Sequence, residues 1–161
     1  MGSQQLILVI GGMMLLGTIA LTINNSFTSK TDMEIYNEAA MTGAAIGQSV
    51  IDRILTRSFD QRTVGRIFRS PDSLTAVGSL GPDTGENNVT LYNDVDDFKN
   101  YVKYDTMSVL GVFRTRVDVN YVQTANPEVI SSSRTFVKRI DVFVTNQYLG
   151  DTLKIFYAVT Y

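Results

Sequence analysis

The longest run of hydrophobic positions in the chain extends from Leu6 to Ile23. Its residues, LILVIGGMMLLGTIALTI, include no charged side chain, and the first charge in the sequence is Lys30. As an α-helix this run would be about 27 Å long, close to the hydrocarbon thickness of a bilayer. A helix that is apolar on all sides has no face to turn to water, so we expect lipid or further copies of the same helix around it.

A polar patch, NNSFTSKTD, follows this run and leaves two possibilities open. Thr31 and Glu34 have the spacing of a capping box, so a second helix could begin there. No Pro or Gly lies between Ile23 and Gly43, so one continuous helix is equally possible.

Residues 33–58 have the hydrophobic spacing of an amphipathic helix. Apolar or small residues recur at steps of three and four, and charges such as Glu34 and Asp52 leave that stripe partly clear. The centre of the segment is rich in small residues, and its small-residue patch consists of Ala39, Ala40, Gly43, Ala44 and Gly47. The patch could pack on the protein's own sheet or on neighbouring copies of the chain, and different faces could do both.

Residues 59–88 lack a hydrophobic period and contain several Pro and Gly, which predicts an irregular region. Asn88-Val89-Thr90 is a sequon in this region, so Asn88 is a possible glycosylation site. A group of arginines there suits a solvated loop better than a phosphate site, because no phosphate-binding glycine motif accompanies them. These arginines are Arg57, Arg62, Arg66 and Arg69.

The segment Asn93-Asp94-Val95-Asp96-Asp97 allows two interpretations. Its oxygen ligands at alternate positions are typical of the opening of a calcium loop. Phe98, however, stands where that loop needs glycine, and Tyr104 stands where it needs glutamate. The same residues suit the start of a helix with Asp94 as its N-cap, and we adopt this interpretation and predict no metal site. That helix would have Phe98, Tyr101 and Val102 on one face.

Three segments in the last third of the chain alternate between apolar and polar positions, as half-buried strands do. Their apolar sets are Val117, Val119 and Tyr121; Phe136, Ile140, Val142 and Val144; and Leu153, Ile155, Tyr157, Val159 and Tyr161. The short link 146–151 predicts an antiparallel hairpin, and the longer link through Asn126-Pro127 predicts a hairpin with an exposed loop. We therefore expect an antiparallel meander whose inner face is covered by the helix of residues 33–58.

The amino-acid composition of the chain excludes several classes of function. The chain has no Cys and no His, so it lacks disulfides, thiolate metal sites and the commonest general base. Residues 59–161 contain 11 Lys and Arg against 12 Asp and Glu, which gives no basic field for nucleic acid. We therefore expect that the chain is not an enzyme and has no catalytic or cofactor-binding residues. We also expect it to bind no cofactor and no nucleic acid.

The order of these elements resembles the type IV pilin-like family. Members of that family have an apolar N-terminal helix with an amphipathic extension, then a variable loop and a closing antiparallel sheet. The resemblance implies an α+β fold with an N-terminal helix, residues 1–58, and a globular sheet domain, residues 59–161. Within the helix, residues 1–29 would be the apolar membrane or filament-core segment and residues 30–58 the amphipathic part.

Three features depart from the usual pattern of the family. Pilins usually begin with a methylated apolar residue, often Phe, and have Glu at the fifth position, whereas this chain has Met1 and Gln5. Gln5 can hydrogen-bond the N-terminal amine of a neighbour but cannot pair with its charge. The C-terminal disulfide loop of many pilins is also missing. MGSQQ contains no Lys or Arg, so we expect this end to be retained rather than removed as a secretory signal.

The resemblance implies a structural subunit of an extracellular type IV pilus-like filament. Such a subunit is inserted in the inner membrane first and is then polymerised with copies of itself by filament assembly machinery. The residues expected in the helical core of the assembly are Gln5, Leu6, Ile7, Val9, Ile10, Gly11, Gly12, Leu15, Leu16, Ile19 and Ile23. The alternative is a membrane-tethered periplasmic or surface domain, including a minor pseudopilin of a secretion system.

Overall fold

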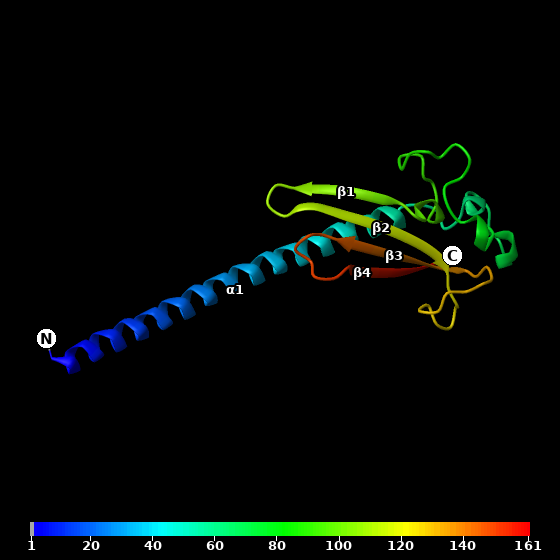
Figure 1. The fold of residues 1–161 in the computed structure, drawn as a ribbon. Helices are drawn as coiled ribbons and strands as arrows, with labels where there is room; N and C mark the ends of the chain where they lie inside the picture. The colour runs from blue at the N-terminus through cyan, green and yellow to red at the C-terminus, as the bar shows by residue number, and fades with distance from the viewer. Residues whose placement is uncertain (1) are drawn as a thin grey trace. The chain divides into compact units, whose positions relative to one another are not determined.

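Residues 2–161 are described by a computed structural model (Figure 1). These residues form one long helix, four short 3-10 helices and four strands. In chain order these are α1 (Ser3–Leu55), η1 (Gln61–Thr63), η2 (Pro71–Ser73), η3 (Val77–Ser79), η4 (Asp96–Phe98), β1 (Val102–Met107), β2 (Gly111–Tyr121), β3 (Val137–Thr145) and β4 (Leu153–Thr160). The chain divides into two compact units at the boundary between Glu38 and Ala39, and we describe each unit by itself.

The first unit consists of the initial part of α1. The helix continues through the polar patch that follows Ile23, so the second of the two possibilities, a single helix, is the observed one. The Thr31 hydroxyl donates to the Phe27 carbonyl oxygen at 3.1 Å, one turn back along the same helix. Thr31 is therefore an interior residue of α1 rather than the cap of a second helix.

In the second unit, α1 packs on the sheet through one face. Its buried residues recur at steps of three and four, and they are Ala39, Gly43, Gly47, Val50, Ile51 and Ile54. A Cβ atom added at Gly47 would lie 2.7 Å from Cδ1 of Ile155 in β4, so the helix backbone closely approaches the sheet there. Three residues of the small-residue patch thus pack on the protein's own sheet, and Ala40 and Ala44 are half-buried beside them.

The four strands form an antiparallel sheet in the order β1-β2-β3-β4. Val117 of β2 is paired with Val142 of β3, and Val142 is paired with Ile155 of β4. The alternating residues predicted for the inner face of β2 and β3 are fully buried: Val117, Val119, Tyr121, Ile140, Val142 and Val144. The predicted α+β fold, a long helix packed on a C-terminal antiparallel sheet, is confirmed (Figure 1).

The helix predicted to start at Asp94 is wrong. Only one 3-10 turn, η4, forms there, and Val102 begins strand β1, where it is paired with Arg116. Asn100, with a φ of 63°, has the left-handed conformation that redirects the chain between η4 and β1. The N-cap of η4 is Val95 rather than the predicted Asp94, but Asp94 still holds the turn, because its Oδ1 accepts a hydrogen bond from the Asp96 backbone N–H at 2.9 Å.

The predicted irregular region, residues 59–88, contains only short 3-10 turns. It is attached to the sheet through a small apolar cluster in which Phe59, Leu74 and Tyr121 are buried. Asn88 lies in this region with an exposed side chain whose Oδ1 accepts from the Thr90 backbone N–H at 3.1 Å. The region therefore contacts the sheet at a few positions, and one of these positions contains the polar cluster described below.

Candidate functional site

The first candidate site is the uncharged part of α1. Every large apolar side chain from Leu6 to Phe27 is at least 46% exposed. The helix is long and apolar enough to cross a membrane, with a mean hydropathy of 2.5 over its best 18-residue window. Water-soluble monomers rarely expose apolar surface of this extent, so this part of α1 requires lipid or protein around it.

Four hydroxyl groups within this segment are satisfied by the helix itself. Those of Thr18, Thr22, Ser26 and Thr28 donate to carbonyl oxygens three or four residues earlier, at 2.8 to 3.1 Å. A hydroxyl bonded in this way enters an apolar environment without an unpaired donor. The surface that can be buried at low cost therefore continues past Ile23 to Thr28, interrupted by two asparagine amides.

The residues predicted for the assembly core surround the axis of α1 rather than occupying one face. Consecutive residues on a helix point about 100° apart, so Ile7 beside Leu6 and Leu16 beside Leu15 cover different sides. Around Gly11, Gly12 and Gly17, an added Cβ would meet nothing within 4 Å. These glycines leave the backbone open to the close approach of another helix.

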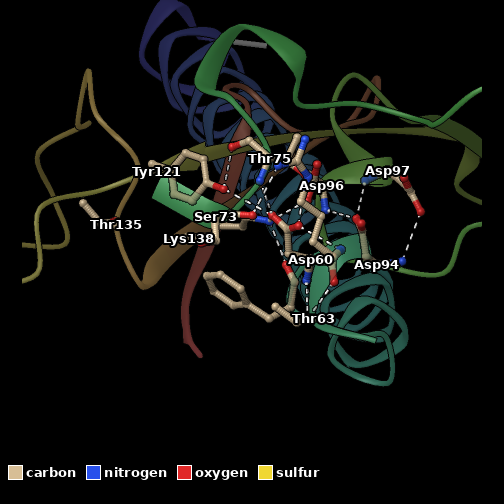
Figure 2. A network of polar contacts seen from close by, with 12 residues as sticks. Asp60, Thr63, Ser73, Thr75, Asp94, Asp96, Asp97, Tyr121, Thr135 and Lys138 are labelled. Atoms are coloured by element: carbon tan, nitrogen blue, oxygen red, sulfur yellow. Dashed lines mark hydrogen bonds and ion pairs between the residues drawn. The ribbon is translucent and has the colours of Figure 1, made fainter. Parts of the chain in front are cut away.

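The second candidate site is a buried polar cluster that the sequence analysis missed, centred on Lys138 of β3 (Figure 2). The side chain of Lys138 has no exposed surface. Its Nζ donates to Asp96 Oδ1 at 2.5 Å, to the Phe59 carbonyl oxygen at 2.7 Å and to Asp60 Oδ2 at 3.2 Å. The same nitrogen lies 4.6 Å from the ring centroid of Phe59 and 5.3 Å from that of Tyr121.

The sequence did contain a signal for this cluster. Lys138 lies at an inward position of the alternating pattern, between Phe136 and Ile140, where every other residue of the set is apolar. A buried lysine needs an acidic partner, so the acidic residues of the preceding irregular region were the groups to consider. The partners that the structure provides are Asp60, directly before η1, and Asp96, the first residue of η4.

Asp60 is held as a carboxylate. It accepts hydrogen bonds from the Thr75 backbone N–H at 2.9 Å, the Thr75 hydroxyl at 3.0 Å and the Arg62 backbone N–H at 3.1 Å. Burial acts to raise the pKa of Asp60, but the Lys138 charge and these donors together lower the pKa below its usual range. Tyr121, which donates to the Thr75 carbonyl oxygen at 2.9 Å, stays protonated because burial and Asp60 raise its pKa.

The carboxyl groups at η4 behave in the opposite way. Burial raises the pKa of Asp96 in spite of the adjacent Lys138 charge. Burial, followed by the neighbouring Asp96 and Asp97, raises the pKa of Asp94 to about 8. Asp97 Oδ2 accepts from the backbone N–H groups of Asn93 and Asp94 at 2.8 and 3.0 Å, so these acids bind the turn itself. The cluster therefore combines the Lys138 amine, the Asp60 carboxylate and two carboxyl groups, Asp94 and Asp96, whose pKa values are raised.

Two other features from the sequence are separate from this cluster. Arg62 and Arg66 line an open surface hollow with Phe68 near η1, whereas Arg57 and Arg69 are not among its lining residues. The structure thus does not bring the four arginines together at this hollow. Gln5 lies near the start of α1 with an exposed side chain.

Comparisons of the chain with protein-family models, with curated proteins and with solved structures find no match. The exposed apolar segment of α1 and the Lys138 cluster are therefore the features from which its function is inferred.

Proposed function

We propose that the chain is a structural subunit of a type IV pilus-like extracellular filament. In the filament, the segment of α1 from Leu6 to Phe27 packs against the same segment of neighbouring copies. The observation that supports this most is the exposure of every large apolar side chain of the segment, on all sides of the helix. A sheet can cover one side of a helix, whereas lipid or a bundle of identical helices covers all sides.

Energetic considerations favour a persistent assembly. Burying one large apolar side chain stabilises by about 1.5–3 kcal/mol relative to water, so the return of the segment to water is strongly disfavoured. Lipid already provides much of this gain before assembly, so helix packing must supply the preference for the filament. Gly11, Gly12 and Gly17 permit close helix packing, and the internally bonded hydroxyls of Thr18 and Thr22 add no unpaired donor.

In this proposal the second unit forms the solvated coat of the filament. It has its own buried core, and α1 contributes to that core only from Ala39 onward. Residues 59–161 are nearly neutral, with 11 basic and 12 acidic side chains, so like-charge repulsion between adjacent copies is small. The helix supplies the assembly contacts and the sheet unit faces solvent.

The experiment is to shear cells that naturally produce the chain and to collect the released material without detergent. We expect electron microscopy to show thin uniform filaments that contain the chain, and mass spectrometry to find an N-methylated N-terminus. Cells producing the Leu16→Arg variant at the same level should release none. Finding the chain only in detergent extracts of membranes would contradict the filament and leave a membrane-tethered domain.

A further inference from the structure

The Lys138 cluster places a buried amine in contact with a buried carboxyl group. Lys138 has no exposed side-chain surface, and the side chain of Asp96 is 3% exposed. The contact between Lys138 Nζ and Asp96 Oδ1 is 2.5 Å, which brings the nitrogen next to the carboxyl carbon that bears this oxygen. Reacting groups held in this way gain the advantage of an intramolecular reaction over the same groups in solution.

We propose that Lys138 and Asp96 become joined by an intramolecular amide bond between Nζ and Cγ, formed when the chain folds and promoted by Asp60. Asp60 Oδ2 lies 3.2 Å from the same nitrogen, within reach of the proton that must be removed. The rings of Phe59 and Tyr121 lie over the amine at 4.6 and 5.3 Å, so they hold the nitrogen in place beside Asp96.

The reaction balances with these three side chains alone. Asp60 accepts one proton from the Lys138 ammonium, and the neutral amine attacks the carboxyl carbon of Asp96. The bond between that carbon and its hydroxyl oxygen breaks, and the hydroxyl leaves as water with the second proton from the nitrogen. Asp60 is left protonated, and no oxidant, metal or cofactor takes part.

The protonation states at the cluster suit this reaction. Burial raises the pKa of Asp96, which favours the neutral carboxyl group that an amine can attack. The charge of Lys138 lowers the pKa of Asp60, so Asp60 is an unprotonated carboxylate that can accept the first proton when the reaction begins. A buried charged pair also pays a desolvation penalty that a neutral amide does not, so bond formation relieves a cost of the folded state.

The bond would hold the irregular region onto the sheet. Asp96 and Lys138 are 42 residues apart, and the chain has no cysteine with which to form a disulfide. Closing such a loop covalently restricts the unfolded chain, so we expect the unfolding midpoint to be about 10 °C or more above that of a variant without the bond. The inference does not depend on the filament, because purified chain is sufficient to test it.

The decisive measurement is the intact mass of the purified full-length chain in detergent. We expect a mass lower by one water molecule than the sequence requires, and a tryptic peptide pair linked through Lys138 and Asp96. After denaturation, an amine-acetylating reagent should modify four of the five lysines. The full sequence mass, with all five lysines acetylated, would overturn the proposal and leave a buried ion pair.

Two variants give matched controls that retain the shape of the cluster. Asp96→Asn should lose ammonia instead of water and should reach the same final mass as the native chain. Asp60→Asn lacks the general base, and we expect it to keep its full sequence mass and all five reactive lysines. An unchanged mass for Asp96→Asn would overturn the bond to this residue, and one water lost from Asp60→Asn would overturn the role of Asp60.

Discussion

The parts of α1 before and after the boundary at Glu38 share one backbone conformation but differ in what covers their side chains. Between Leu6 and Phe27, large apolar side chains are exposed on all sides. From Ala39 to Leu55, the buried residues form a single stripe against the protein's own sheet, and charged residues such as Asp52 and Arg53 are exposed. The difference indicates that the chain completes its own core only in the second unit and depends on other molecules in the first.

Glycine has different surroundings in the two parts of the helix. Gly43 and Gly47 bring the helix backbone against Val144 and Ile155 of the sheet. Gly11, Gly12 and Gly17 have no neighbour within 4 Å of an added Cβ, although glycine costs about 1 kcal/mol in a helix relative to alanine. In the second unit this cost is offset by visible packing. In the first unit we attribute it to packing between copies.

Of the changes considered, removing residues 1–29 should have the largest effect, because it removes most of the exposed apolar part of α1. The remaining chain keeps every buried residue of the second unit, so we expect it to fold as a monomer in buffer without detergent. The full-length chain should require detergent or should sediment as an assembly. Analytical ultracentrifugation and circular dichroism test both statements. Aggregation of the shortened chain would show that the second unit also exposes a surface through which copies associate.

A charge introduced into the first part of the helix should have the next largest effect. Leu16→Arg should disfavour membrane insertion by about 2.5–3.5 kcal/mol, because Arg is costly at the centre of a spanning helix. Ser49→Arg is a matched control at an exposed position of the second part and should change insertion little. Membrane fractionation of both variants gives the comparison, and equal insertion of the two would remove the distinction between the parts.

Replacing a glycine of α1 by a larger residue should destabilise the second unit only when the glycine lies in the second part of the helix. A Cβ at Gly47 would lie 2.7 Å from Ile155 and 3.4 Å from Val144, so Gly47→Val should destabilise the second unit by about 1–3 kcal/mol. Gly12→Val meets no neighbour within the chain and should leave the unfolding of the second unit unchanged. Denaturant unfolding followed by tyrosine fluorescence measures both, and an equal loss for the two variants would contradict the assigned packing.

A change of pH should affect the stability of the second unit alone. The raised pKa of Asp94, about 8, means that its contribution to stability is complete in acid and is lost as pH rises through 8. As long as Lys138 keeps its charge, the lowered pKa of Asp60 acts in the opposite direction, because the contribution of Asp60 to stability is lost as pH falls through that lowered pKa. Stability should therefore be greatest at mildly acidic pH and decline towards pH 9.

Asp94→Asn tests this assignment, because an asparagine oxygen can still accept the backbone N–H of Asp96. We expect the decline in the free energy of unfolding between pH 5 and pH 9 to become shallower in this variant. Any slope that remains would belong to titratable groups other than Asp94. A slope identical to that of the native chain would show that the pH dependence arises from groups other than Asp94.

The sequence predicted the elements whose side chains follow a regular period. The uncharged run gave the start of α1, and alternation gave the inner faces of β2 and β3, because one burial environment extends along each element. Strand β1 was missed because the acids before it suggested a helix start, whereas the extended backbone of Lys99 ends η4 after three residues. The inward position of Lys138 was a local signal, but the cluster was missed because its partners Asp60 and Asp96 are far from Lys138 in the chain and no local pattern identifies them.

Solvent access to position 16 in intact assembled material tests the central claim most directly. The chain has no cysteine, so Leu16→Cys and the exposed-loop control Gln123→Cys each carry one thiol. In sheared material collected without detergent, we expect a water-soluble maleimide to label the cysteine at position 123 and to leave the one at position 16 unmodified until detergent dissolves the assembly. Equal labelling of both positions in the intact material would contradict an assembly built on the apolar helix.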